Sequence, residues 1–324
     1  MLQYFRPLKF DTYTLSIDNV VCDYYLHPLQ RESFLRVLEK LSMEYCCEVT
    51  HWDSLRMGSY KLQFSVALPD GGSFWVGVGL NTTKTHYGRI RLEFNPNKVA
   101  GYDCLRKLLG CLNNSSSPIH MGVVRYDLAV DFPVLRENVY LVKDSRVYTE
   151  ISHSLSDRTQ YLGTGSKSGR VKLYNKQIES KLGHPLTRLE LTLDPETPYD
   201  DVNWPTVYLI RDLQLVFDEL KLSDVDRFIL NALLQGCGSL ADLSYHLRKK
   251  YKNILENYVD FFRLPWDAYE KIRAQLRDFI RYPEVPLTGW PAKEAIEPYL
   301  LPAVSAADWE EIFESTPFDE EADT

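Results

Sequence analysis

The sequence of 324 residues predicts an α+β protein with a mainly antiparallel sheet, flanking helices and a helical C-terminal region. Two observations lead to this class. In the first two thirds of the chain, short apolar runs with a period of two alternate with runs of helical spacing, and turn signals separate them. In the last third the helical spacing takes over.

The first predicted sheet element is a hairpin. Residues 60–68 and 72–80 flank the sequence Pro-Asp-Gly-Gly, and Asp-Gly between runs of period two is a strong hairpin signal. A third strand follows at 88–96, where Arg91 and Glu93 alternate with apolar residues and therefore share one face. The other predicted elements of the first two thirds are helices at 29–45 and 102–112, strands at 122–132 and 186–194, and a hairpin formed by 158–164 and 169–176.

The last third predicts two capped helices and one more helix after Trp266. Ser223 and Ser239 are the N-cap candidates of the first two, and Gln-Gly-Cys-Gly at 235–238 is the predicted break between them. Prolines and acidic residues beyond Tyr282 predict an irregular end.

Composition restricts the class of protein further. No stretch approaches the roughly 20 apolar residues of a membrane helix, and the N-terminus has no apolar core of a signal peptide. We therefore expect a cytoplasmic protein without a membrane partner. None of the six cysteines is in a Cys-x-x-Cys pair, which predicts reduced, structural thiols.

Charge is distributed unevenly along the chain. Residues 308–324 contain eight acidic residues and no basic one. Their charge of −8 equals the net charge of the whole chain. Residues 161–190 contain six basic residues against two acidic ones. Such a basic segment favours a polyanion, and a solvated charged face is the open alternative.

Three carboxylates lie on predicted strands. Asp127 and Asp131 are four residues apart and share a face, whereas Glu190 points away from its leucine neighbours. Acids clustered on a sheet require a cation or basic partners. A Mg²⁺ or Mn²⁺ ion would suit these oxygen ligands, and cross-strand pairing with arginines such as Arg125 or Arg188 is the alternative.

Tyr174 lies beside them on the predicted hairpin, with Lys172 and Lys176 two residues to either side. A phenol has a pKa of about 10, so it needs adjacent cations or a metal ion to act as a nucleophile. The two lysines would attract a DNA phosphate and favour the phenolate. Tyr161 is a second candidate, and either tyrosine could instead be a packing residue among the 21 in the chain.

The ordered motifs at 89–98, 123–132, 159–180 and 187–194 resemble the replication initiation factor family, over about Lys61 to Asn253. These are the initiators of rolling-circle plasmids and filamentous phages, with relatives among conjugative relaxases. The resemblance implies a metal-dependent nickase whose tyrosine attacks one DNA strand, stays on the 5′ end and leaves a 3′-hydroxyl. A conjugative relaxase and an origin-binding initiator that does not cut are the alternatives.

The resemblance also implies the site. The nucleophile would be Tyr174, assisted by Lys172 and Lys176, and the metal ligands would be Asp127, Glu190 and less firmly Asp131. Further candidates are Glu93, Arg91 and Tyr161. The paired histidines of the better-known single-strand nickases are missing, which agrees with an all-carboxylate site.

The expected partner is origin DNA, single-stranded or in a cruciform, with a host helicase, a host polymerase and a second copy of the chain as further partners. The DNA-binding candidates are Lys167, Arg170, Arg188, Arg248, Lys249, Lys250 and Lys252. The predicted domains are a catalytic domain at 1–215, a helical region at 216–282 and an acidic tail at 283–324. The catalytic domain is either one unit or two related halves at about 1–112 and 113–215. The helical region is either a helix-turn-helix or a plain antiparallel hairpin.

Overall fold

The computed structural model describes residues 5–26, 28–52, 62–69, 71–78, 88–99, 103–113, 122–154, 156–165, 168–210 and 213–281. The predicted acidic tail and Lys167 lie outside these residues. Within them the fold is α+β with antiparallel strand pairing, as the sequence predicts. No helix in these ranges is both long and apolar enough to cross a membrane.

The chain forms two compact units, each described by itself. Unit 1 is built mainly from Asn19–Val124, and unit 2 from Arg6–Asp18 and Arg125–Ala274. Three elements pass from one unit into the other along the chain. They are β2 (Thr14–Leu26), β7 (Gly122–Phe132) and α8 (Trp266–Ile280).

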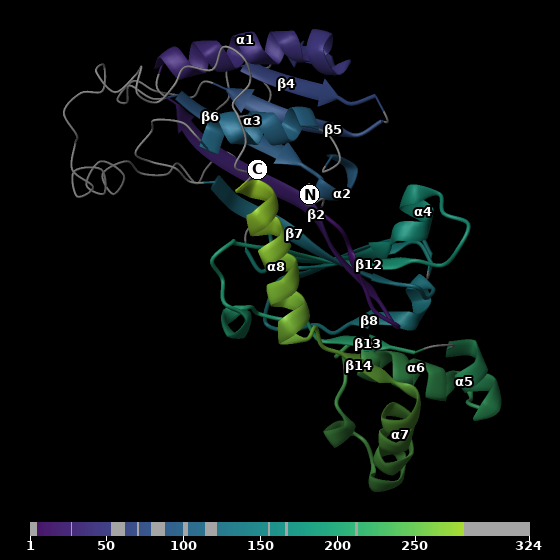
Figure 1. Ribbon diagram of the computed structural model, residues 1–324. Helices are drawn as coiled ribbons and strands as arrows, with labels where there is room; N and C mark the ends of the chain where they lie inside the picture. Colours follow the sequence, from purple (N-terminus) through teal and green to yellow (C-terminus); the bar gives the residue numbers. More distant parts are fainter. Residues whose placement is uncertain are drawn as a thin grey trace. The chain divides into compact units, whose positions relative to one another are not determined.

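Unit 1 contains the antiparallel strand order β3–β4–β5–β6–β2, and α1 and α3 lie against these strands (Figure 1). The predicted hairpin is confirmed, since β4 pairs with β5 in the register Ala67↔Ser73. Ile90, Leu92 and Phe94 are buried in alternation with polar residues. The elements are α1 (Pro28–Tyr45), β3 (Glu48–Trp52), β4 (Leu62–Ala67), β5 (Ser73–Val78), β6 (Gly88–Phe94), α2 (Pro96–Val99) and α3 (Asp103–Asn113).

Unit 2 contains the antiparallel strand order β7–β12–β11–β10–β9. The predicted hairpin of the middle third is β10 paired with β11, and Gly163 and Gly169 in its loop have φ values of 84° that disfavour other residues. The elements are β1 (Leu8–Lys9), β9 (Tyr148–Ser152), β10 (Arg158–Leu162), β11 (Val171–Asn175), α4 (Lys176–Ser180) and β12 (Thr187–Leu193).

A second, three-stranded sheet in unit 2 has the order β14–β13–β8, and helices follow it along the chain (Figure 1). Leu230, Leu234, Tyr251 and Ile254 of two of these helices are buried in one apolar cluster with Tyr140 of β8. The elements are β8 (Val139–Leu141), β13 (Val207–Leu209), α5 (Leu213–Glu219), α6 (Asp224–Leu234), α7 (Tyr245–Tyr258) and β14 (Asp260–Phe262).

The predicted caps are half right. Ser223 is the N-cap of α6, and its hydroxyl and the Asp226 side chain form a reciprocal capping box. Ser239 caps only a short 3₁₀ turn, and α7 begins six residues later, after Ser244. Residues 235–244 thus separate α6 from α7, whereas a helix-turn-helix has a turn of about three or four residues. The short break predicted from Gln-Gly-Cys-Gly is wrong.

Truncation of Ser223 and of Ser244, the N-cap residues of α6 and α7, should change the stability of the protein by different amounts. Ser223→Ala should lower the free energy of unfolding by about 1 kcal/mol, because it removes an acceptor for the Asp226 amide. Ser244→Ala is the matched control, since its hydroxyl makes no capping hydrogen bond, and it should change stability by less than about 0.5 kcal/mol. Urea unfolding measures both, and equal losses would contradict the assignment.

Candidate active site

One face of the unit 2 sheet gathers the predicted site residues. Across β11 and β12, Lys172 lies opposite Glu190 and Tyr174 opposite Arg188. Across β12 and β7, Arg188 lies opposite Asp131 and Thr192 opposite Asp127. Residues directly opposite each other in an antiparallel pair share a face. We call this the polar face, formed by Asp127, Asp131, Lys172, Tyr174, Arg188, Glu190 and Thr192.

Tyr174 and Glu190 form the closest pair on the polar face. The Tyr174 hydroxyl donates to Glu190 Oε1 at 2.6 Å, and the Tyr174 side chain is almost fully buried. Burial and the Glu190 carboxylate raise the pKa of Tyr174 well above its usual value. Burial also raises the pKa of Glu190, against the opposing effect of the Tyr174 hydrogen bond. The phenol is therefore neutral, with a proton acceptor already in hydrogen-bond contact.

The two lysines lie by the tyrosine ring. Lys172 Nζ is 3.9 Å from the centroid of the Tyr174 ring and 3.7 Å from Glu190 Oε2. Lys176 Nζ is 5.6 Å from the same centroid and forms an ion pair with Glu179. The sequence-based expectation that these lysines favour the phenolate is not met, because burial and the Glu190 carboxylate raise the pKa of Tyr174, and Arg188 is the cation that acts against them. Their charge remains available to an anion near the ring.

Arg188 is the most heavily engaged cation of this face. It donates to both carboxylate oxygens of Asp131, at 2.6 and 2.8 Å, and to Asp18 Oδ1 at 2.5 Å. Burial disfavours its charge, but the two carboxylates outweigh this and raise the pKa of Arg188 above its usual value. Sequence reasoning offered Arg188 both as a DNA contact and as a cross-strand partner of the strand carboxylates. The structure shows the cross-strand pair, with Asp131, whereas Asp18 was missed. The only sequence signal for Asp18 is a single acid in the strand 14–22, whose other residues are uncharged.

The three predicted metal ligands do not converge. Asp131 is held by Arg188, Glu190 by Tyr174 and Lys172, and Asp127 accepts from the Thr192 hydroxyl at 2.8 Å. Within the described ranges, no group of three or more His, Cys, Asp or Glu side chains is placed to hold a metal ion. In this arrangement the carboxylates do not fit a Mg²⁺ or Mn²⁺ site.

Arg91 and Glu93 belong to unit 1. Arg91 makes two 2.7 Å hydrogen bonds to the carboxylate of Asp23, and Glu93 accepts from the Asn19 side-chain amide at 2.8 Å. The predicted common face of the two residues is confirmed by the burial of their alternating neighbours. Each has a structural partner within its own unit.

Tyr161 and Arg170 extend the polar face past Lys172. Tyr161 of β10 lies directly opposite Lys172, and the Arg170 guanidinium carbon is 5.1 Å from the centroid of the Tyr161 ring. An arginine against an aromatic ring forms a cation–π pair. The polar face therefore continues as a half-buried aromatic and basic surface beside Tyr174.

The predicted basic patch on α7 is partly occupied by internal contacts. Arg248 donates to the backbone oxygens of Leu240, Ala241 and Leu243, at 2.9 to 3.1 Å. Lys250 is paired with Asp226 at 2.7 Å. Two of the remaining candidates are exposed: Lys249, and Lys252, which forms a surface pair with Glu256 at 3.6 Å.

The chain has few detectable similarities to known proteins. No protein-family model and no curated protein matches the chain. Among solved structures, the chain is similar to a rolling circle replication initiator protein from Geobacillus stearothermophilus, with a TM-score of 0.36 and 14% identity. That similarity covers 85% of this chain and 100% of the other.

The Arg188 ion pairs should make a large contribution to stability. Arg188→Met leaves Asp131 without its bidentate partner in a side-chain environment that is only 12% exposed, which should cost about 3 kcal/mol. Lys252→Met is the control, because its pair with Glu256 is more than 60% exposed on both sides and should contribute less than about 0.5 kcal/mol. Similar losses in denaturant unfolding would refute the assignment.

The raised pKa of Glu190 predicts a pH-dependent stability difference. The folded state binds this proton more tightly than the unfolded state, so the stabilisation is complete below the ordinary pKa of about 4.3. It is lost as pH rises through the raised folded pKa. Glu190→Gln removes this titration, so the Tm of the variant should rise relative to that of the wild type as pH increases above about 4. A Tm difference that stays constant with pH would contradict the shift.

Proposed function

We propose that the protein is a plasmid or phage replication initiator that nicks one DNA strand through Tyr174. The observation that carries the proposal is the 2.6 Å hydrogen bond from the Tyr174 hydroxyl to Glu190, with Lys172 Nζ within 4 Å of both side chains. A nucleophile, a proton acceptor and a cation thus meet at one place. The ordered motifs that resemble initiators include all three residues.

In the proposed reaction the Tyr174 oxygen attacks a backbone phosphorus atom. Its proton passes to Glu190, which acts as a general base in direct contact with the nucleophile. A bond forms between the phenolic oxygen and phosphorus, and the bond from phosphorus to the 3′-oxygen breaks. The leaving oxygen takes a proton from solvent and becomes a free 3′-hydroxyl. The 5′ end stays on Tyr174 as a phosphotyrosine.

The lysines supply charge to this step. Lys172 and Lys176 lie over the Tyr174 ring, where an approaching phosphate would replace part of their present contacts with Glu190 and Glu179. Groups that stabilise charge at the reacting phosphate act more strongly in the transition state than in the ground state. We assign them to phosphate binding.

Strand binding is assigned to the continuation of the polar face. Tyr161 and Arg170 offer a ring and a guanidinium beside Lys172, a combination that binds single strands through stacking and charge. Exposed Lys249 on α7 would add a backbone contact. The 3′-hydroxyl would then prime a host polymerase, with a host helicase and a second copy of the chain as the partners of a full replication cycle.

The buried environment of the Tyr174 phenol supports a second candidate function, an initiator that binds origin DNA without cutting it. A buried phenol with a raised pKa is a poor nucleophile until the site opens and Glu190 accepts the proton. A conjugative relaxase would use the same chemistry as the first candidate.

A supercoiled plasmid with the protein's own origin tests the proposal. We expect the wild type to relax the plasmid and remain bound to the 5′ end, in reactions with and without added Mn²⁺. Tyr174→Phe should form no adduct, and Glu190→Gln should slow its formation by about 10²- to 10⁴-fold. Tyr161→Phe is the matched control, because Tyr161 lies on the same face of the sheet, and this variant should still form the adduct.

The outcomes separate the candidates. A wild type that binds the plasmid but leaves it supercoiled would favour the initiator that does not cut. An adduct that persists in Tyr174→Phe and disappears in Tyr161→Phe would move the nucleophile to Tyr161. Full activity of Glu190→Gln would exclude Glu190 as the base.

A further inference from the structure

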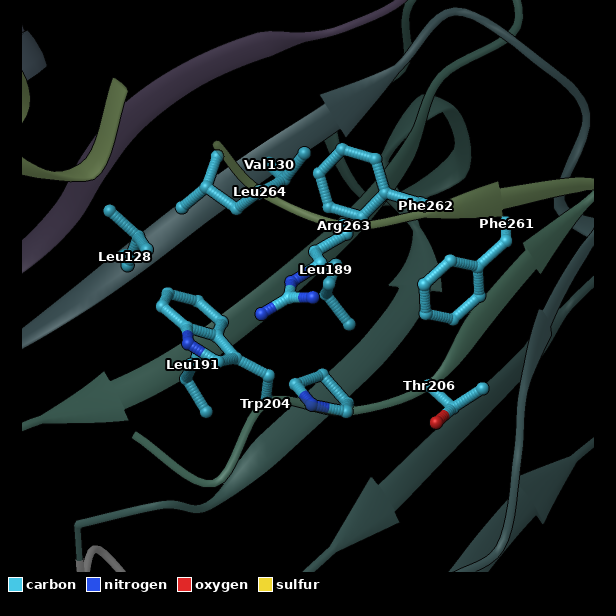
Figure 2. A pocket seen from close by; sticks show the side chains of 11 residues that line it. Leu128, Val130, Leu189, Leu191, Trp204, Thr206, Phe261, Phe262, Arg263 and Leu264 are labelled. Carbon is cyan, nitrogen blue, oxygen red and sulfur yellow. The ribbon is translucent and has the colours of Figure 1, made fainter. Parts of the chain in front are cut away.

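The opposite side of the β7–β12 pair carries a cavity. It has a volume of about 220 Å³ and lies within unit 2 (Figure 2). Its floor is formed by Leu128, Val130, Leu189 and Leu191, and its walls by residues 204–206 and 261–264. The floor residues alternate along each strand with the residues of the polar face, so the cavity is not part of the proposed nicking site.

The walls provide few hydrogen-bonding groups. The Trp204 indole N–H already donates to the Tyr199 backbone oxygen at 3.0 Å. The four floor side chains are apolar and at most 4% exposed. Among the lining side chains, Thr206 and Arg263 supply the remaining polar groups. A nucleobase would lose its hydration here with few partners in return, so the lining favours an apolar or aromatic group.

The size of the cavity limits the occupant. Pockets for whole small-molecule ligands measure about 300 to 1,000 Å³, and this one is smaller. It therefore fits one large side chain. Phe261 at the wall is 58% exposed, so an aromatic ring could enter against another ring, an arrangement that aromatic side chains favour.

Arg263 adds a charge preference. In Figure 2 its side chain extends among the lining residues, and it is exposed. No hydrogen bond or ion pair of its guanidinium is found in the part of the chain that the structure describes. A guanidinium beside an apolar cavity selects a hydrophobic side chain that has a carboxylate next to it.

The chain itself contains such a segment outside the described residues. Residues 308–324 include eight acidic residues and no basic one, and Trp309 lies between Asp308 and Glu310. The 27 residues from 281 to 307 that connect it to α8 could span roughly 90 Å. Chain length therefore does not prevent the segment from reaching the cavity.

We propose that this cavity is the docking site of the chain's own acidic segment 308–324. The Trp309 indole occupies the cavity against Phe261, and the carboxylate of Asp308 or Glu310 pairs with Arg263. The contact holds an acidic peptide on the side of β7 and β12 opposite Tyr174.

Photo-crosslinking in the full-length chain tests this proposal. Trp309 is replaced by p-benzoylphenylalanine, the protein is irradiated, and the attached peptides are identified by mass spectrometry. We expect crosslinks to residues 204–206 or 261–264. The matched control carries the same amino acid at Trp290, which has no acidic neighbour within three residues, and should not label the cavity.

A charge reversal supplies the second measurement. Arg263→Glu should reduce the crosslink from position 309 at least fivefold, whereas Lys271→Glu, an exposed cation of α8 outside the cavity, should leave the yield unchanged. Labelling from position 309 only at other surfaces would overturn the proposal. Equal labelling of the cavity from position 290, or a yield insensitive to Arg263→Glu, would overturn it as well.

Discussion

The polar face depends on the charge of Arg188. Without it, the Asp18 and Asp131 carboxylates would lose their partner, and Lys172, the other cation of the polar face, is already paired with Glu190. Desolvated carboxylates that lack a cationic partner would raise one another's pKa or move apart. Arg188 instead connects β2, β7 and β12 through one guanidinium, and it lies directly opposite Tyr174. The ion pair thus neutralises the two acids beside the tyrosine, while the register of β11 and β12 places Tyr174 and its acceptor.

The side chains of β12 alternate between two environments, the polar face on one side of the sheet and the apolar cavity on the other. Glu190 faces Tyr174 on the polar face, while its neighbours Leu189 and Leu191 line the apolar cavity behind it. A register shift of one residue would exchange the two sets. The burial of the leucines therefore also holds Glu190 in reach of the Tyr174 hydroxyl, so stability and the proposed chemistry depend on the same strand pairing.

Local patterns predicted the elements well where local physics decides them. Alternation identified the strands, and the Ser223 capping box marked the start of α6. The same reasoning failed at Ser239, since a serine with an acid three residues later also caps a 3₁₀ turn. It failed for Arg248 as well, because a basic helix position does not reveal that backbone oxygens five and eight residues earlier in the chain will accept hydrogen bonds from the guanidinium.

The sequence by itself determined which side chains share a face, since strand periodicity is a property of the backbone. It therefore placed Tyr174 with Lys172, and Asp127 with Asp131, before any contact was known. Only the tertiary structure decided the partners. Glu190 became the acceptor of the Tyr174 hydroxyl and Asp18 a ligand of Arg188 because strand order and register bring together residues up to 170 positions apart, which no local pattern encodes.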